Sequence, residues 1–296
     1  MLNKPLDGAV AVRFFMPSAA LAPYVSTYYL TEINLAPEDA VEDWLHPEWA
    51  NLRFATGGEW SAGLGDAPRE PMSGAILTGP TSQAAHFRLG GGTRVWGIGL
   101  LPLGWLRLIG VPASGFTDRT VAVANEPCCA RFQDLPAAVL TGAPSPAEEA
   151  ARIDDYLLAL LARTAPGEDE PRIRAAHSAL IDEEVTSVSA LAERLGISSR
   201  SLERLSLKAF GFSPKLLLRR QRFLRSLAQF MLDPSLTWIK TLDFQYVDQA
   251  HFVRDFRRFM AMSPRRFGSI DHPIMRAAAQ ARTAAAGAAV QALHQP

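Results

Sequence analysis

The spacing of apolar residues changes character about halfway along the chain. In the first half, short apolar runs such as Gly74–Thr78 and Arg94–Leu100 lie between turn signals such as Gly90-Gly91-Gly92. Short strands at close spacing with glycine-rich turns are typical of a β-barrel or a β-sandwich. Leu103–Ile109 has the spacing of a short helix packed on that domain. The pattern therefore predicts a β-rich domain over residues 1–145.

The next segment has helical spacing and then a break. Ile153, Leu157, Leu160 and Leu161 predict a helix over 146–163, which we interpret as a candidate dimer contact. The stretch 165–171 is acidic and contains two prolines and a glycine, so it is the expected interdomain linker. Residues 146–170 are thus predicted to be helix and linker.

Helical stripes dominate from residue 171 onward. They predict six helices with short joints, the longest over about 214–231, and these must bury their apolar faces against one another. We therefore expect an independent all-α domain over 171–268, and an α+β multidomain chain overall. Residues 269–296 are Ala-rich and nearly unpatterned, so we expect a frayed helix or disorder there and assign it no function.

Charge divides the chain in the same way as periodicity. The 296 residues have a net charge of zero, but residues 1–170 hold 11 Lys and Arg against 20 Asp and Glu. Residues 171–270 hold 17 against 9, which gives this part a net charge of +8. A basic module of this size favours a polyanion as its partner. The 48% hydrophobic content excludes a mostly disordered chain.

Other features of the composition indicate where the chain works. The first 30 residues contain Lys4, Asp7 and Arg13 and do not resemble a signal peptide. The most apolar run, 95–106, is shorter than the roughly 20 residues that a membrane span needs. The only cysteines, Cys128 and Cys129, are adjacent, so they build no disulfide framework. We expect a soluble cytoplasmic protein with no membrane partner.

One segment reads as a complete helix-turn-helix. A helix ends at Leu195, Gly196 supplies the positive φ of a tight turn, and Ser198 is placed to cap a second helix. The N-terminal half of such a second helix meets base edges and phosphates. The residues that we expect to contact DNA there are Ser198, Ser199, Arg200, Ser201, Arg204 and Lys208.

A second unit is predicted between Leu236 and Phe259. Asp248 is placed to cap its second helix, and Gln can pair with adenine and Arg with guanine in the major groove. We therefore expect DNA contacts from Gln249, His251, Arg254 and Arg257, although His251 has the alternative of a structural hydrogen bond.

The helix between the two units is predicted to hold them in successive major grooves. Its roughly 18 residues span about 27 Å, against about 34 Å between grooves on one face of DNA. It also carries basic side chains suited to phosphates, namely Arg219, Arg220, Arg222 and Arg225.

These motifs together resemble a known family. The stretch 172–267 resembles the C-terminal DNA-binding domain of AraC/XylS-type transcription regulators, on the basis of Ala192–Arg204, Gly211–Lys215 and the run from Asp248-Gln-Ala-His-Phe252 to Pro264. The resemblance implies two helix-turn-helix units that bind double-stranded promoter DNA in a sequence-specific way. An activator, with RNA polymerase and a second copy of the chain as partners, is one expectation for such a regulator, and activation and repression stay open. Trp238–Tyr246 is one residue short of the family pattern. In addition, Gln245 and Ala261 replace turn glycines, at roughly 1 kcal/mol or more each if φ is positive.

The N-terminal part is more loosely similar to sensor-like domains that precede this module. The similarity implies a cupin-like β fold with effector binding or dimerisation. Trp44, Trp49 and Trp96 are weak candidates for lining a ligand pocket, with core packing as their alternative role. His46 and His86 are isolated, so we expect neither a metal nor another cofactor.

No nucleophile elbow, phosphate-binding loop or paired catalytic carboxylates stand out, so we do not expect an enzyme. The sequence predicts a transcription regulator controlled by an unknown effector through its N-terminal domain. Two alternatives stay open. One is a cupin-like small-molecule-binding protein or enzyme with an attached nucleic-acid-binding module. The other is a constitutive DNA-binding protein whose front domain only dimerises.

Overall fold

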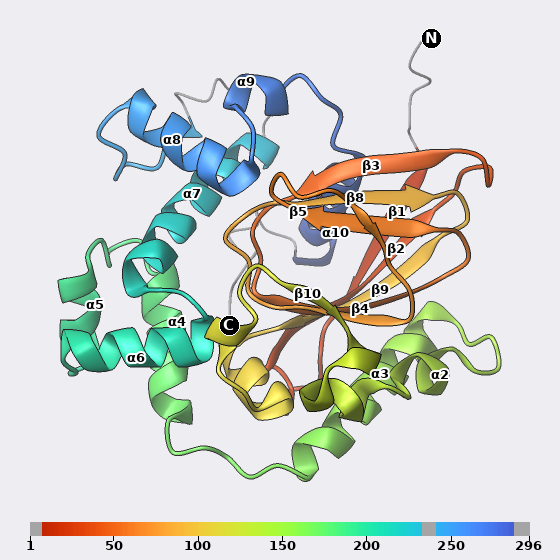
Figure 1. The fold of residues 1–296 in the computed structure, drawn as a ribbon, viewed down its shortest axis with the longest axis horizontal. Helices are drawn as coiled ribbons and strands as arrows, with labels where there is room; N and C mark the ends of the chain where they lie inside the picture. The colour runs from red at the N-terminus through yellow and green to blue at the C-terminus, as the bar shows by residue number, and fades with distance from the viewer. Residues whose placement is uncertain (1–7, 233–240, 287–296) are drawn as a thin grey trace.

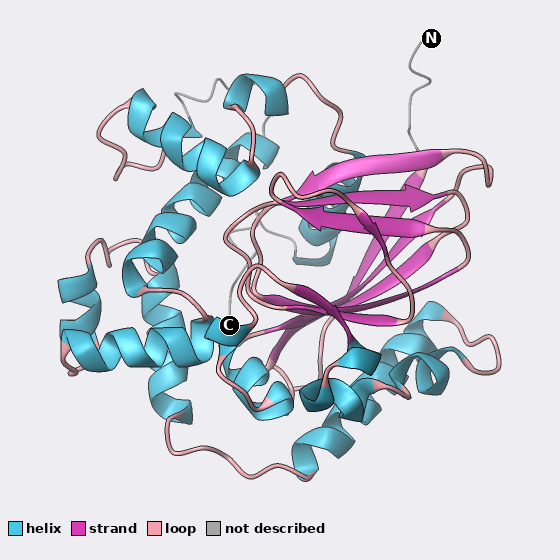
Figure 2. Ribbon diagram, in the orientation of Figure 1, coloured by secondary structure: helices cyan, strands magenta, loops and turns pink. Residues whose placement is uncertain are grey.

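The computed structural model describes residues 8–232 and 241–286. Its N-terminal part consists of two antiparallel sheets, as expected from the short apolar runs. The two sheets do not close into a barrel (Figures 1 and 2). The six-stranded sheet has the order β1-β2-β9-β4-β7-β10, and the four-stranded sheet has the order β3-β8-β5-β6. The strands are β1 (Val10–Phe15), β2 (Val25–Ile33), β3 (Ala40–Leu45), β4 (Ala50–Thr56), β5 (Trp60–Leu64), β6 (Glu70–Pro71), β7 (Ala75–Thr78), β8 (Ala85–Gly90), β9 (Arg94–Leu100) and β10 (Thr120–Ala122).

Alternation along the strands separates two apolar layers. Tyr28 and Trp96 point from the six-stranded sheet toward α3 (Pro146–Ala162), where their polar atoms meet Asp154 and Glu149 at 2.8 Å each. The intervening positions face the space between the two sheets, which we call the cup. Gly97 is needed on this side, because a Cβ there would lie 2.0 Å from the Tyr29 ring. The cup is therefore lined by one face of each sheet.

Helices close the lower side of the six-stranded sheet in Figure 1. They are α1 (Pro102–Gly104) with the π-turn Trp105–Ile109, α2 (Leu135–Leu140) and α3, together with the 3₁₀ turns Ala113–Gly115, Val123–Asn125 and Pro127–Phe132. Ser145 and Glu148 form a capping box at the start of α3, and the apolar stripe of α3, including Ile153 and Leu157, is buried. The stripe packs within the chain, and the interpretation of the helix as a dimer contact stays a prediction.

Five of the six helices predicted for the C-terminal half are present with bounds close to those expected, and a further short helix, α9, follows them. They are α4 (Glu170–Ile181), α5 (Val188–Arg194), α6 (Ser199–Phe210), α7 (Pro214–Leu232), α8 (Gln249–Met260) and α9 (Pro264–Phe267). Gly196 has φ +61°, as the tight turn between α5 and α6 requires. The short helix predicted around Trp238 lies outside the described residues, apart from its last positions near Leu242.

The helical half is not packed independently of the sheets. A single apolar cluster runs from Leu21 and Trp96 through α3 to Leu191, Phe210 and Leu217. A backbone hydrogen bond also joins the two halves, from Ala84 N to Phe259 O at 2.7 Å. The helices on the left of Figure 1 and the strands on the right therefore share one core.

The Ala-rich tail is the largest departure from expectation. It forms α10 (Pro273–Ala286), which leaves the helical half and packs on β1 and β3 across the cup (Figure 1). Ile274 is buried among the apolar residues of the cup. The hydrophobic periodicity of this segment is weak because Ala fits both a buried and an exposed helix face. The described part of the tail is thus an ordered part of the fold.

Candidate nucleic-acid interface

The first candidate recognition helix, α6, begins as the sequence predicts. Ser198 Oγ accepts a hydrogen bond from Ser201 N at 3.2 Å, which satisfies one of the free N–H groups at the start of the helix. Leu202, Leu205 and Ala209 are buried. Ser199, Arg200 and Arg204 are exposed and Ser201 is half-buried. The N-terminal half of α6 therefore offers basic and hydroxyl groups to a ligand.

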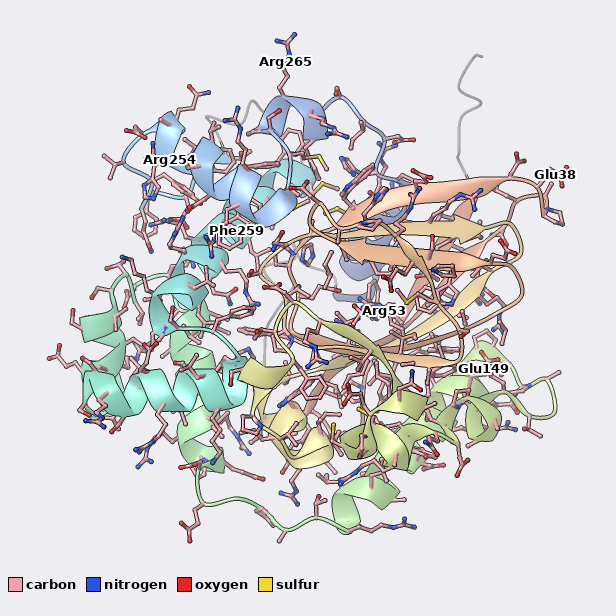
Figure 3. The ribbon with its side chains drawn as sticks, viewed as in Figure 1. Glu38, Arg53, Glu149, Arg254, Phe259 and Arg265 are labelled. Atoms are coloured by element: carbon pink, nitrogen blue, oxygen red, sulfur yellow. The ribbon has the colours of Figure 1, made fainter. Side chains whose placement is uncertain are left out.

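The second candidate recognition helix, α8, has the same construction. Asp248 caps it by accepting a hydrogen bond from His251 N at 2.6 Å. Gln249, Arg254 and Arg257 are exposed. Figure 3 shows Arg254 on the side of the molecule away from the strands, whereas Phe259, at the far end of α8, lies toward them. The exposed groups of α8 are thus not covered by the β domain.

His251 lies between these exposed groups but is itself engaged. Its ring is half-buried, its Nε2 lies 3.0 Å from Arg222 Nη2, and it packs edge-on against Tyr246. This geometry matches the structural alternative named for His251, and it directs the ring inward rather than toward a base.

A buried carboxylate that sequence analysis did not single out organises this region. Asp255 on α8 is 0% exposed and forms ion pairs with Arg219 and Arg222 of α7. It also accepts a hydrogen bond from Tyr246 Oη at 3.2 Å, and burial raises the pKa of that tyrosine. The sequence signal was available, since Asp255 is a charged residue next to the apolar stripe of α8. Arg219 and Arg222 therefore serve the α7–α8 packing.

Arg220 is a clear correction. It is 0% exposed, and its Nη1 donates to Thr81 O at 2.9 Å and Glu48 O at 3.2 Å in the β domain. Its guanidinium carbon lies 3.8 Å from the centre of the Trp49 ring. Burial lowers the pKa of the guanidinium to about 9, so it stays charged at neutral pH. A side chain enclosed in this way does not reach a phosphate.

The two other basic candidates at the edges are also paired. Lys208 is exposed, but its Nζ lies 2.8 Å from Asp169 Oδ2 in the segment before α4. Hydrogen bonding to Lys208 lowers the pKa of that carboxyl group. Arg225 forms an ion pair with Asp243. These pairs hold helices together, whereas Arg200, Arg204, Arg254 and Arg257 have exposed side chains at the two recognition helices.

The two substituted turn glycines behave differently. Ala261 follows α8 with φ +55°, so the predicted left-handed position is occupied by alanine. Gln245 is not among the described residues with positive φ, and its backbone N bonds to Asp243 Oδ1 at 2.9 Å. The expectation of a strained Gln245 is therefore wrong, because the turn before α8 takes a form that needs no glycine there.

None of the three candidate tryptophans lines the cavity between the sheets and α10. Trp96 is in the core, and its Nε1 donates to Glu149 Oε2 at 2.8 Å. Trp49 packs against Arg220, and Trp44 stacks on His86 with ring centres 3.9 Å apart. The cavity that does lie in the cup is lined by other residues. The alternative of core packing is the correct one for Trp96.

The cysteines and the possible metal-binding side chains were compared within the described ranges. Burial, and the neighbouring Cys128, raise the pKa of the Cys129 thiol to about 12, which keeps it protonated. Among residues 8–232 and 241–286, no group of three or more His, Cys, Asp and Glu is placed to hold a metal ion. No helix in that part of the chain is both long and apolar enough to cross a membrane.

Comparison with known proteins matches two segments of the chain to families. Residues 191–269 match a family described as a helix-turn-helix domain. Residues 13–122 match a family described as a domain of unknown function (DUF6597). No curated protein matches the chain in sequence.

Among solved structures, ToxT from Vibrio cholerae bound to an unsaturated fatty acid is 10% identical over 88% of this chain and 94% of its own, with a TM-score of 0.43. Another ToxT structure from Vibrio cholerae is 11% identical over 88% and 98%, with a TM-score of 0.44. The AraC-like transcriptional activator CuxR is 14% identical over 76% and 89%, with a TM-score of 0.24.

The segment 191–269 contains the end of α5 and all of α6 to α9, including both capped candidate recognition helices. The segment 13–122 contains both sheets. The chain therefore consists of an N-terminal β-rich domain of the DUF6597 family followed by a helix-turn-helix domain of the AraC type.

Proposed function

We propose that this protein is a sequence-specific DNA-binding transcription regulator, acting on promoter DNA in the cytoplasm. The observation that carries the proposal is the pair of capped helices, α6 and α8, each of which carries exposed arginines. Arg200 and Arg204 belong to the first helix, and Arg254 and Arg257 to the second. Arginine can contact phosphates and pair bidentately with guanine, so each helix carries groups for both positioning and base reading.

The helix α7 supports a two-groove arrangement. Its 19 residues give a length of about 28 Å, and it is anchored to α8 through Asp255. A rod of this length suits two recognition helices in successive major grooves on one face of DNA. Three of its arginines, Arg219, Arg222 and Arg225, contribute to this arrangement through internal ion pairs, rather than as the main phosphate contacts.

The β domain is proposed to control this activity through an unidentified effector. Its shared core with α4 to α6, and its contacts to α7, α8 and α10, give a bound effector a route to the DNA-binding half. Contact with RNA polymerase and a homodimer belong to the same proposal. The apolar stripe of α3 is already buried, so a dimer must use another surface.

The test is selection of bound fragments from the source genome with the purified full-length chain. A single enriched consensus is expected, with two short conserved blocks about one helical turn apart for the two units of one chain. The double variant Arg200→Ala/Arg254→Ala should lose the enrichment, whereas Arg163→Ala, an exposed arginine at the end of α3, should keep it. Absence of any enriched sequence with the folded wild-type chain would refute the proposal.

A further inference from the structure

A cavity of about 100 Å³ lies in the cup, between the inner face of the six-stranded sheet and two helices of the C-terminal half. Val12 and Phe14 of β1 and Thr31 of β2 form the wall on the sheet side. The opposite wall comes from α7 and α10, which are separated from these strands by about two hundred residues of sequence. The cavity therefore belongs to neither half alone.

The chemistry of the lining selects a class of ligand. Ten of the fourteen lining residues are apolar and none is lysine or arginine, while the polar members are Tyr29, Thr31, His46 and Glu48. The Nδ1 atom of His46 lies 3.0 Å from Pro47 O. Glu48 is the acidic member, and its carboxylate is ion-paired with Arg53. The Tyr29 hydroxyl is bonded to Asn51 Oδ1 at 3.0 Å. A bound anion would find no counter-charge among Lys or Arg here, so the lining favours a neutral apolar molecule.

The size of the cavity sets an approximate limit on that molecule. An apolar cavity of roughly 150 Å³ in another protein stays dry and holds one benzene ring. The present cavity is of that order, which suits a molecule with a single ring. Ala278 and Ala279 of α10 line it, so the space is left by two small side chains on the helix.

The wall formed by α10 is fixed by a charged group of the β domain. Asp43 of β3 is 0% exposed, and its Oδ2 accepts hydrogen bonds from Ile274 N and Met275 N at 2.9 Å each. Its Oδ1 lies 2.8 Å from His272 Nδ1. A carboxylate at a helix N-terminus satisfies free N–H groups and interacts favourably with the helix dipole. Asp43 therefore holds α10 over the cup.

The cavity also touches the core that carries α8. Leu227 of α7 lines the cavity and belongs to the apolar cluster that contains Phe223, Phe256 and Phe259. Met275 of α10 belongs to both the lining and that cluster. A molecule in the cavity would thus contact the packing of the second helix-turn-helix unit directly.

We propose that this cavity is a binding site for a small, neutral, apolar molecule. Binding of this molecule affects the second helix-turn-helix unit through α10, which Asp43 holds in place. The regulatory half of this inference rests on the proposed function, whereas the binding site itself does not.

The first test uses the wild-type full-length chain with toluene and, separately, benzoate as probes. Toluene should raise the melting temperature in a concentration-dependent way, because it binds the folded state alone, and benzoate should not. Equal stabilisation by benzoate, or none by toluene, would overturn the proposed site. Since no substitution is involved, this arm does not depend on the folding of a variant.

The second test fills the cavity. Ala278→Phe should weaken toluene binding at least tenfold, whereas Gln280→Phe, an exposed position on the same helix, should leave it unchanged. Retained binding by Ala278→Phe would place toluene elsewhere and reject the site.

The third test releases the wall. Asp43→Asn should speed tryptic cleavage after Arg276 and weaken toluene binding, because the cap on α10 loses its charge. Unchanged cleavage and affinity would reject the role of Asp43. Promoter binding is measured on the same samples. If wild type binds toluene but no DNA sequence, the proposed function fails and the binding site stands.

Discussion

A single buried arginine shows how a residue's role depends on its surroundings. Arg220 has no acidic partner within hydrogen-bonding distance among the described residues, and its charge is held by two carbonyl oxygens and the face of Trp49. Arg220→Ala would leave those carbonyls unpaired and create a cavity between the two halves. We expect a loss of about 3 kcal/mol in the free energy of unfolding, measured by urea denaturation.

The same variant separates this role from DNA contact. The salt dependence of promoter binding should keep its slope in Arg220→Ala, measured at a temperature where the variant is folded. A slope reduced by about 1, with stability unchanged, would mean that Arg220 neutralises a phosphate instead.

His177 lies in the same interdomain layer and links stability to pH. Burial, and the nearby Arg220 charge, lower the pKa of its imidazole to about 4. The unfolded chain therefore binds a proton at His177 between about pH 6.5 and pH 4, and the folded chain does not. Stability should fall as pH drops through this window, by up to about 3 kcal/mol at its lower end.

The measurement is urea unfolding of wild type and His177→Leu at a series of pH values. The variant should lose the part of the pH dependence that lies between pH 4 and 6.5. Identical pH slopes in the two proteins would show that other groups govern acid stability.

The exposed arginines are expected to read separate parts of one site. Arg200→Ala should relax base preference in one block of the operator, and Arg254→Ala in the other, about 10 base pairs away. Loss of a bidentate guanine pair costs about 1–3 kcal/mol of discrimination. Base-resolved footprints of both variants test this, with Arg163→Ala as control. Overlapping footprints would exclude successive grooves.

The residue scale also marks the limit of what the sequence predicted. The caps Ser198 and Asp248 could be placed because capping depends on local sequence. The burial of Arg220 could not, because it depends on carbonyl groups of Glu48 and Thr81, more than a hundred residues away. Asp43 was missed for the same reason, since its helix partner lies 231 positions along the chain.

At the scale of elements, the end of α8 offers a direct test of backbone strain. Ala261 sits at φ +55°, a conformation that costs an L-residue about 1–2 kcal/mol. Ala261→Gly relieves this strain and adds about 0.4–1 kcal/mol of chain entropy to the unfolded state. We expect a net stabilisation of about 0.5 kcal/mol, measured as an increased urea midpoint.

The matched control is Ala250→Gly, at an exposed position early in α8. Glycine there should destabilise by about 0.5–1 kcal/mol, because it adds flexibility without relieving strain. If both variants shifted the midpoint in the same direction, positive φ would not be the cause of the Ala261 effect.

Helix existence was predictable at this scale, but the surface each helix covers was not. The stripe Ile153–Leu157–Leu160 predicted an amphipathic helix, and the structure confirms it as α3. The apolar periodicity indicates that one face of the helix is buried, but it does not indicate what covers that face. A second copy of the chain and a sheet of the same chain would require the same spacing of apolar residues. For α10, the alanine-rich sequence does not even indicate which face of the helix is buried.

At the scale of the whole molecule, the two halves differ in charge but share a core. Net charge is zero for the chain, yet residues 171–270 carry a net charge of +8, and the arginines Arg200, Arg204, Arg254 and Arg257 of α6 and α8 are exposed. We therefore expect promoter affinity to fall steeply with salt, with a slope of about −0.9 per phosphate neutralised. Fluorescence anisotropy between 50 and 200 mM salt measures this for the full-length chain.

A flat salt response with the same operator would count against phosphate contact altogether.

The division of charge along the sequence predicted the two-part architecture correctly. It could do so because charged residues lie mainly on the surface, and the surfaces of the two parts differ in charge. The sequence did not predict the apolar cluster that the two halves share. An apolar stripe indicates that a face is buried, but it does not indicate which element packs against that face.

The Asp43 cap also has a consequence for how the chain is made. Asp43 leaves the ribosome early, and its helix partner follows 231 residues later. At about 5–20 residues per second, that interval is on the order of 10–50 s. Until α10 has been translated, Asp43 lacks the backbone N–H groups of Ile274 and Met275 that it binds in the folded chain. The helix α10 can therefore cover the cup only after both sheets have been translated.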